Sequence, residues 1–236
     1  MAELVTDVPT VALAVYAHPD DADVACGGTL ALWAANGCAV HLVVCADGGR
    51  GTTDPAVIPA ELAKRRAAEL AEAAEVVGLA SHRVLGAHDG ELDERAGLRG
   101  ELVALIRGVR PDVVLGHDPT AVFFGQHYFN HRDHRSAGWA LLDALSPSAV
   151  LPHYYPEAGP AHQVATVYLS GTLEPDVWVD ISDTLEKKVA AVECHRSQLT
   201  TAAGWAGTAV RRRAQEAGRH AGVQHAEGFR RLRLGA

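Results

Sequence analysis

Two polar clusters in this sequence hold the residue types that metal binding and acid–base catalysis use. The first, HPDDAD at residues 18–23, lies between apolar segments, and the second, HDPTAVFFGQHYFNHRDHR at residues 117–135, contains four of the chain's 13 histidines. Burying the acids of the first cluster without partners would cost several kcal/mol, and an ordinary solvated surface does not require them at a strand end. A cation is therefore the natural partner of this cluster.

The spacing within the first cluster favours a metal site. His18 and Asp21 are three residues apart, which lets an imidazole and a carboxylate converge on one ion. An imidazole from the second cluster would complete two histidines and one carboxylate, a set that leaves a catalytic zinc with an open position for water. We expect one Zn²⁺ per chain, with Fe²⁺ as the alternative because it uses a similar triad. Asp20 would then be free to act as general base on that water.

The elements that must position these clusters follow an alternating pattern. Short β-branched runs alternate with longer helical stretches, which is typical of βαβ units and a parallel sheet. The expected strands are 11–17, 39–46, 83–86, 112–116, 164–169 and 177–181. The expected helices are 24–36, 59–77, 98–109, 134–145, 184–195 and 206–217.

We therefore predict an α/β fold, with a single Rossmann-like domain over residues 1–236 and a mostly parallel, doubly wound sheet. In that strand order the first and fourth strands are neighbours, and ligands bind in the crevice at their carboxyl ends. The first strand ends at Ala17 and the fourth at Gly116, directly before the two polar clusters. The topology thus predicts that two clusters distant in sequence face each other.

Composition and charge narrow the classes of partner. The chain is 48% hydrophobic, which suffices for a sizeable core, and its net charge of −8 argues against nucleic acid and membrane surfaces as partners. A small-molecule substrate is the simpler expectation, and a homo-oligomer is left open. The longest apolar runs are too short to cross a bilayer and the first ten residues lack a signal-peptide pattern, so we expect a cytoplasmic protein.

Several residues have structural interpretations that compete with the functional ones. Asp20 and Asp21 could cap a helix that begins near Val24. The four cysteines have no C-x-x-C pairing, and we interpret them as reduced thiols of the core. The arginines near the C-terminus are interpreted as a solvated face, and they are Arg211, Arg212, Arg213, Arg230, Arg231 and Arg233.

The two clusters together resemble the LmbE-like, or PIG-L-like, zinc-dependent N-deacetylases. AHPDDADVACGGTLA at 17–31 is similar to the opening motif of that family, and HRDHRSAG at 131–138 is similar to its second histidine motif. Weaker similarities are RAAEL at 66–70, HDGEL at 88–92 and KKVAAVECHRSQ at 187–198. The resemblance covers most of the chain.

The resemblance implies a role for each matching residue. It implies His18, Asp21 and His134 as the zinc ligands and Asp20 as the general base. It also implies that His131, oriented by Asp133, stabilises the tetrahedral intermediate or protonates the leaving amine, which agrees with the ability of a carboxylate-held imidazole to stay cationic.

The resemblance extends less directly to residues around the substrate. It implies that Arg66 and Asp89 lie near the polar groups of the substrate. The alternative for Arg66 is an exposed helix residue that pairs with Glu69. His117 and His127 are expected at the pocket rim, not as ligands.

Two positions depart from the family pattern. Relatives usually have proline where this chain has Arg132, which would either alter the rigidity of the loop or reach toward an anionic substrate. Several sugar deacetylases have tyrosine where this chain has Phe129. Either the neighbouring Tyr128 substitutes for it through a shift of the loop, or zinc alone polarises the carbonyl, or the substrate differs. His195, Ser197 and Gln198 recur in the carboxyl-terminal motif, and His195 is at least as well explained as a structural histidine that closes a helix.

The resemblance implies a metal-dependent amidohydrolase that removes an N-acyl group, most simply acetyl, from an amino-sugar conjugate such as an N-acetylglucosaminyl compound. An amidase of a mycothiol-type thiol S-conjugate is the alternative within the family. A non-hydrolytic nucleotide-binding Rossmann module is the alternative from another class, based on GGRG at 48–51. That motif belongs after the first strand, where this chain has HPDD, and acids there would repel a pyrophosphate.

Overall fold

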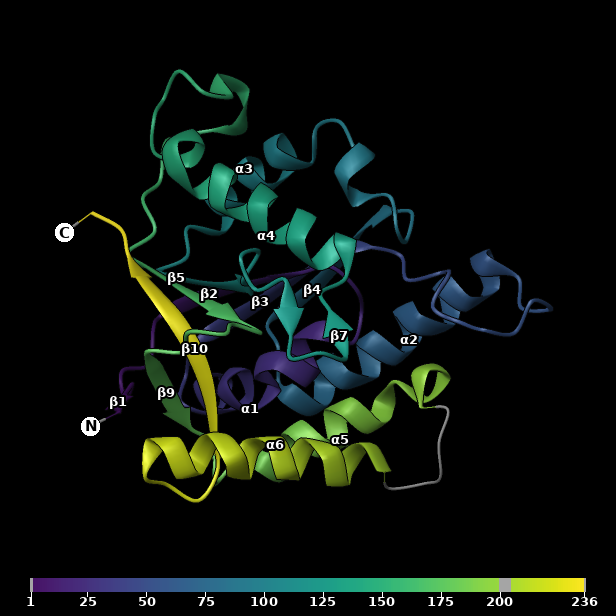
Figure 1. Cartoon of the computed structure of the whole chain (residues 1–236). Coiled ribbons are helices and arrows are strands. Elements are labelled where there is room, and N and C mark those ends of the chain that lie inside the picture. The colour runs from purple at the N-terminus through teal and green to yellow at the C-terminus, as the bar shows by residue number, and fades with distance from the viewer. Residues whose placement is uncertain (1, 200–204, 236) are drawn as a thin grey trace.

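A mixed sheet forms the centre of the molecule in this computed structural model, which describes residues 2–199 and 205–235 (Figure 1). Within the described residues the sheet has eight strands in the order β1-β9-β10-β8-β5-β2-β3-β4. Their bounds are β1 Glu3–Leu4, β2 Val11–Tyr16, β3 Ala39–Ala46, β4 Ser81–Ala87, β5 Val113–His117, β8 Thr166–Ser170, β9 Val177–Asp180 and β10 Ala226–Arg233. All pairings are parallel except those of β10, which runs antiparallel to both β8 and β9.

The strand order confirms the predicted α/β fold with a mostly parallel, Rossmann-like sheet. β2, the first long strand, lies between β3 and β5, so the chain reverses its direction of winding at β2. Such a reversal opens a crevice at the carboxyl ends of the two strands concerned. The segments that follow β2 and β5 are the two polar clusters, and the sheet therefore brings them together.

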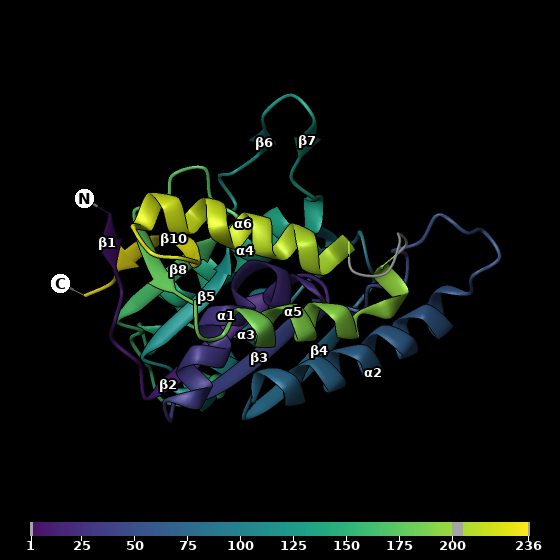
Figure 2. The ribbon, with the colours of Figure 1, turned by 90° about the horizontal axis from the view of Figure 1, so that it is seen from below.

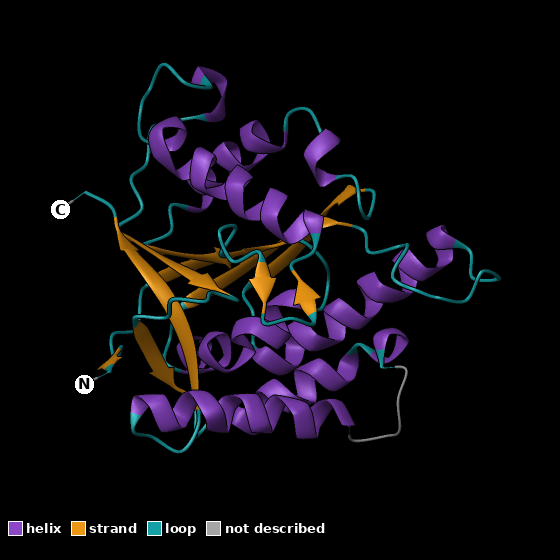
Figure 3. Cartoon of the chain, in the orientation of Figure 1, coloured by secondary structure: helices purple, strands orange, loops and turns teal. Residues whose placement is uncertain are grey.

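Helices cover both faces of the sheet (Figures 1 and 3). One face carries α1 Asp21–Ala35, α2 Pro59–Val77, α5 Leu185–Cys194 and α6 Trp205–Ala221. The other face carries α3 Leu98–Val109 and α4 Arg132–Asp143, with the π-helical turn η2 Ala144–Ala149 after α4. Short 3₁₀ turns complete the helical segments, and they are η1 Leu92–Glu94, η3 Pro156–Ala158 and η4 Arg196–Gln198.

The central strands are buried on both sides because both faces are covered. Successive side chains of β2 alternate between the two cores: Ala14 and Tyr16 belong to the one under α1, and Leu13 and Val15 belong to the one under α3 and α4. Both side-chain rows are apolar, which explains why β2 is a continuous apolar run.

The predicted element bounds agree with the structure most closely where the chain has clear stop signals. α2 and α3 have the predicted bounds, and α2 starts at Pro59 and ends before Gly78, whose φ of 88° suits a left-handed C-cap. α1 starts three residues earlier than predicted, at Asp21. Gly28 of α1 approaches Ile181 so closely that a Cβ would lie 2.7 Å from its Cδ1, which explains a glycine inside this helix.

Three parts of the sheet architecture were not predicted. β1 Glu3–Leu4 pairs in parallel with β9 at one edge of the sheet. The segment between β5 and α4 forms a hairpin, β6 Phe123–Phe124 with β7 Tyr128–Phe129, that projects from the body (Figure 2). The C-terminal segment forms β10, and its arginines are not simply a solvated face. Arg231 pairs with Glu3 and its side chain is only 13% exposed, so this part of the interpretation was wrong.

A buried ion pair joins β10 to the helical layer. Lys188 of α5 contacts Glu227 of β10, and both side chains are almost completely buried. Glu227 also accepts hydrogen bonds from the backbone N–H groups of Gly28 and Thr29 and from the Thr29 hydroxyl. Because all of these donors point at one carboxylate, Glu227 fixes α1, α5 and β10 to one another.

The interpretation of the cysteines as core thiols fits three of the four. Cys26, Cys38 and Cys45 are buried, whereas Cys194 is half-buried. Burial raises the pKa of Cys38 to about 11 and that of Cys45 to about 12. Among the described residues no helix is long and apolar enough to cross a membrane.

The Glu227→Ala variant is expected to lower the free energy of unfolding by about 3–5 kcal/mol, because it leaves the Lys188 ammonium group buried without its partner. Urea denaturation measures the change. Glu186→Ala is the matched control, since it removes the carboxylate of the exposed pair with Arg211 and is expected to leave stability unchanged. Equal effects of the two variants would contradict this role for Glu227.

Candidate metal centre and active site

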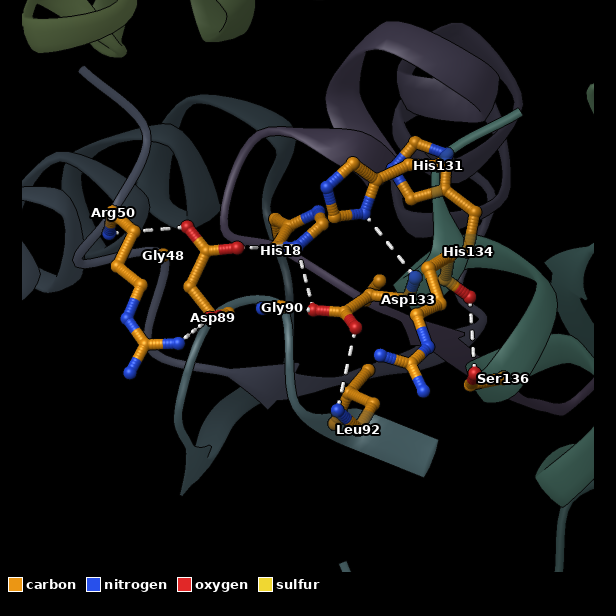
Figure 4. A network of polar contacts seen from close by, with 12 residues as sticks. His18, Gly48, Arg50, Asp89, Gly90, Leu92, His131, Asp133, His134 and Ser136 are labelled. Atoms are coloured by element: carbon orange, nitrogen blue, oxygen red, sulfur yellow. Dashed lines mark hydrogen bonds and ion pairs between the residues drawn. The ribbon is translucent and has the colours of Figure 1, made fainter. Parts of the chain in front are cut away.

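The two polar clusters meet at the carboxyl end of the sheet (Figure 4). His18 follows β2, and Asp21 is the first residue of α1. His131 and His134 come from the start of α4, and Asp89 follows β4. The end of a strand and the start of the next helix thus supply each group, which is the geometry expected at the switch point of an α/β sheet.

Asp21 lies at the centre of the cluster. Its Oδ2 is 3.3 Å from His18 Nδ1 and 3.2 Å from His117 Nε2, and its Oδ1 is 3.2 Å from His134 Nε2. Burial acts to raise the pKa of Asp21, but His134 and His117 outweigh it and hold this pKa well below its usual range. Asp21 is therefore a buried carboxylate surrounded by three imidazoles.

His18 is surrounded by carboxylates in turn. Its Nε2 lies 3.2 Å from Asp89 Oδ1 and 3.3 Å from Asp133 Oδ2. Burial favours the neutral ring, yet hydrogen bonds with Asp133, Asp21 and Asp89 prevail and raise the pKa of His18 to about 12. The three surrounding carboxylates therefore favour the protonated, positively charged form of the His18 ring.

Asn130 determines which nitrogen of His134 faces Asp21. The Asn130 side-chain NH₂ donates to the backbone carbonyl of Ala121, so its Oδ1 faces His134 Nδ1 at 3.0 Å. Nδ1 must then carry a proton, and in the neutral ring the Nε2 lone pair points at Asp21. A lone pair and a carboxylate oxygen 3.2 Å apart attract only if a proton or a metal ion lies between them.

These donors fit a divalent cation. Within the described residues, three overlapping groups place their ligand atoms within 4.8 Å of one another, and they are His18–His131–His134, Asp21–His117–His134 and His18–Asp89–Asp133. Among these groups, His18 and His134 share one and Asp21 and His134 share another, and none contains His18, Asp21 and His134 together. Imidazole nitrogens with one central carboxylate are the donor set of catalytic zinc sites, so this cluster is a candidate metal centre, and the choice of His18, Asp21 and His134 as its ligands stays a prediction.

Asp20 is held by an arginine, not used as a helix cap. Its side chain makes no capping hydrogen bond, and its Oδ1 accepts from Arg66 Nη2 at 2.7 Å. Arg66 is 3% exposed, so the alternative of an exposed residue pairing with Glu69 was wrong. Glu69 is also buried, and it accepts from Ser197 instead.

The GGRG segment at 48–51 makes room for Arg66. A Cβ at Gly48 would lie 2.5 Å from Arg66 Nη1, and a Cβ at Gly51 would lie 2.7 Å from the same atom. The Gly48 carbonyl also accepts from Arg66 Nη1 at 2.9 Å. The lack of side chains at these glycines therefore leaves space for the Arg66 guanidinium that holds Asp20. The segment gives no support to a nucleotide-binding module.

His131 and Asp133 interact differently from the expectation. The Asp133 carboxylate is bound by His18 and by the backbone N–H groups of Gly90 and Leu92 (Figure 4). His131 Nδ1 instead accepts from the Asp133 backbone N–H at 3.2 Å. Asp133 thus orients His131 through its backbone while its carboxylate supports His18.

Arg132 and Tyr128 were both expected to contact the substrate, but they lie in different surroundings. Arg132 pairs with Asp93, so its guanidinium does not take up the expected position toward a substrate. Tyr128 is 53% exposed and lines the cavities beside the metal centre. Of the two aromatic residues of β7, Tyr128 lines these cavities and Phe129 is not among their walls.

The carboxyl-terminal motif at residues 187–198 contributes a buried histidine and one residue of a cavity wall. His195 Nε2 is 2.8 Å from Asp23 Oδ2, and both side chains are buried, which agrees with a structural histidine at the end of α5. Gln198 reaches the cavity that contains His18. His117 is buried beside Asp21 and stacks on His134 at 4.2 Å between ring centroids, whereas His127 is exposed.

A polar cavity of about 330 Å³ opens at this cluster. Its walls include Asp20, Arg50, Arg66, Asp89, His131 and Gln198. Arg50 donates from its backbone N–H to Asp89 and from its guanidinium to the Asp89 carbonyl. Sequence reasoning missed Arg50 and Asn130, since each acts through a residue that is distant in sequence or carries no motif of its own.

Comparisons with known proteins agree with this geometry. Residues 13–145 match the model of the PIG-L family, described as GlcNAc-PI de-N-acetylase, and this range contains both polar clusters. The chain is 37% identical over 191 residues to the diacetylchitobiose deacetylase of Thermococcus kodakarensis, covering 79% of this chain and 69% of the relative. The chain belongs to the PIG-L family. It is accordingly an N-deacetylase, a hydrolase that acts on an amide bond.

Further PIG-L proteins resemble the chain over most of its length. A 1D-myo-inositol 2-acetamido-2-deoxy-alpha-D-glucopyranoside deacetylase of Saccharopolyspora erythraea is 31% identical over 235 residues, covering 79% of this chain and 82% of the relative. The structure of the N,N'-diacetylchitobiose deacetylase from Pyrococcus horikoshii superimposes with a TM-score of 0.86 at 29% identity, covering 97% of this chain and 88% of that one.

The Gly51→Ala variant is expected to lower kcat by up to about 10²-fold, because its Cβ displaces the Arg66 guanidinium from Asp20. Gly51 has no left-handed backbone to strain, so the melting temperature should change little. Steady-state kinetics and thermal denaturation measure the two effects. Gly108→Ala is the matched control, since a Cβ there meets nothing within 4 Å, and equal kinetics of both variants would contradict the role of Gly51.

The Asn130→Ala variant is expected to weaken metal binding by about 10–100-fold, because it removes the group that orients His134. Titration of the protein with zinc against a competing chelator measures the affinity. Asn36→Ala is the control, since this exposed asparagine bonds only to the end of its own helix, at the Leu32 carbonyl. An unchanged zinc affinity in Asn130→Ala would exclude this role.

Proposed function

We propose that this enzyme removes the acetyl group from an N-acetylglucosaminyl compound, with one zinc ion held by His18, Asp21 and His134. The observation that carries the proposal is the Asp21 carboxylate in contact with three imidazoles, directly beside an Asp20 that Arg66 holds in place. When bound, zinc supplies a Lewis acid that polarises a carbonyl oxygen and lowers the pKa of a coordinated water.

Asp20 is the proposed general base. Its Oδ1 is occupied by Arg66, and its side chain is 27% exposed toward the polar cavity, so an oxygen remains available to accept a proton from the attacking water. The Arg66 guanidinium restricts the orientation of the Asp20 carboxylate. A base held in one orientation beside the attacking water is what general-base hydrolysis of an amide requires.

His131 is the proposed proton donor to the leaving amine. Because its Nδ1 accepts from the Asp133 backbone N–H, the proton of the neutral ring lies on Nε2. Burial and the neighbouring His18 and His134 lower the pKa of His131, which makes its protonated form a stronger acid. The Nε2–H of the neutral ring can donate a hydrogen bond to the developing oxyanion, whereas a proton can pass to the amine nitrogen only from the protonated ring, in which Nδ1 no longer accepts from the Asp133 backbone N–H.

The polar cavity is proposed to bind the amino sugar. Arg50, Arg66, Asp89 and Gln198 offer both donors and acceptors to sugar hydroxyls there. Deacetylases of diacetylchitobiose and of an inositol-linked amino sugar among the relatives support this class of substrate.

The proposal extends to the organisation and location of the enzyme. Residues 1–236 are proposed to act as one deacetylase domain, since the segment after β2 and residues of α1, α2, α4 and η4 contribute to a single site. A cytoplasmic location is supported by the four free thiols, of which three are buried.

Zinc-loaded protein is expected to release acetate from N-acetylglucosamine or its conjugates, and removal of the metal with a chelator should abolish this release. Asp20→Asn is expected to lower kcat by about 10²–10⁴-fold while retaining stoichiometric zinc, because only the base is lost. Metal analysis and an acetate assay measure both results.

Asp54→Asn is the control for Asp20→Asn, since Asp54 is an exposed residue of the loop before α2 and should tolerate the change. Protein that binds no divalent metal, or an Asp20→Asn variant with unchanged acetate release, would contradict the proposed function.

A further inference from the structure

A second and larger cavity adjoins the metal centre. It has a volume of about 620 Å³, and three of its wall residues, Asp21, Tyr128 and His134, also line the polar cavity. The two cavities therefore meet at the candidate metal centre. A substrate whose scissile bond lies at this centre has one end in each cavity.

The positions of Asp20 and His131 decide which cavity holds the amine side of the substrate and which holds the acyl side. Asp20 and His131 line the polar cavity and are not among the walls of the larger one. His131 must reach the amine nitrogen, so the amine and its sugar lie on the polar side. The acyl group, the other substituent of the carbonyl carbon, then extends past Asp21 and His134 into the larger cavity.

The walls of the larger cavity suit an apolar occupant. The apolar wall residues come from α1, the hairpin, α6 and β10, and they are Val24, Ala25, Phe124, Ala214, Ala217 and Ala226. Val24 is 37% exposed and Tyr128 is 53% exposed. Apolar side chains that remain accessible beside a reactive centre gain free energy when a ligand covers them.

The charged wall residues do not call for a charged occupant. Lys188 and Glu227 neutralise each other, and Glu227 is further bound by three hydrogen bonds from Gly28 and Thr29. Arg213 is exposed, so water can solvate its guanidinium.

The volume of the cavity exceeds what acetyl needs. A methyl group takes up roughly the space of one water molecule, about 30 Å³. Cavities of about 300–1,000 Å³ bury ligands of many atoms. An acetyl group would thus leave most of the 620 Å³ unfilled.

We propose that this larger cavity is an acyl-binding site, and that the enzyme hydrolyses amides of linear aliphatic acids of about four to eight carbons more efficiently than acetamides. The inference rests on the proposed function, because it uses the roles of Asp20 and His131. The step itself is unchanged: water adds to the carbonyl carbon, the C–N bond breaks, and the carboxylate and the protonated amine leave.

A series of N-acyl glucosamines tests the proposal directly. Amine release from the acetyl, butyryl and hexanoyl compounds is expected to show a kcat/KM that rises about threefold to fourfold per added methylene that is buried. A kcat/KM for the hexanoyl compound below that for the acetyl compound would overturn the proposal. So would a preference for the adipoyl compound over hexanoyl, since that result would assign the cavity to an anion held by Arg213.

A variant of α6 tests whether the acyl chain of the substrate lies against this helix. Ala217→Phe fills the larger cavity, and it is expected to lower kcat/KM at least tenfold more for the hexanoyl than for the acetyl compound. Gln215→Phe places the same ring at an exposed position of α6 and should preserve the wild-type ratio. An unchanged ratio in Ala217→Phe would show that the acyl chain does not lie against α6.

Binding of the acid products separates this inference from the proposed function. Calorimetry with zinc-loaded protein is expected to give tighter binding of hexanoate than of acetate, whether or not amides are hydrolysed. If acetamides are hydrolysed and hexanoate binds no better than acetate, the acyl site is wrong and the deacetylase proposal stands. If no amide is hydrolysed and hexanoate still binds more tightly, the apolar site stands and the proposed function is wrong.

Discussion

The contact of one buried carboxylate with three imidazoles is the constraint on which the rest of this site depends. At the carboxyl end of the sheet, the Asp21 carboxylate is stabilised by His18, His117 and His134, which face its two oxygens, and by the His18 backbone N–H, which donates to Oδ2. Removal of the imidazoles would leave the carboxylate charge unpaired, and removal of the carboxylate would leave imidazole nitrogens unpaired. Either loss costs more free energy than any single packing contact contributes. Because α1 carries Asp21 and α4 carries His134, both helices must stay at this end of the sheet for the carboxylate and the imidazoles to remain paired.

A second layer of residues holds these groups and sets their protonation. Asn130 fixes the ring of His134, and the Asp133 and Asp89 carboxylates fix that of His18. Arg66 does the same for Asp20, and the glycines at 48 and 51 leave space for its guanidinium. Such supporting contacts restrict each functional side chain to one orientation, so the acid, the base and the ligands meet without rearrangement.

The site is asymmetric because different elements build its two sides. Loops after β2, β3 and β4 contribute to the polar cavity, whereas α6 and β10 contribute only to the larger one, and Tyr128 of the hairpin lines both. Except for Gln198, the walls of the polar cavity belong to the segment that matches the PIG-L family at residues 13–145, and α6 and β10 lie beyond it. If the larger cavity is the acyl site proposed above, α6 and β10 set which acyl groups fit while the residues that carry the chemistry stay the same.

The sequence by itself determined the α/β class, the bounds of α2 and α3, and the ligand and base candidates, because apolar periodicity, stop signals and local clusters such as HPDDAD are short-range properties. The tertiary structure alone decided that Arg66 holds Asp20, that Asn130 orients His134, and that Asp133 uses its carboxylate for His18 and its backbone for His131. It also decided the insertion of β10 between β8 and β9. These contacts join residues that no local pattern relates, and their geometry exists only once the strands and helices are assembled.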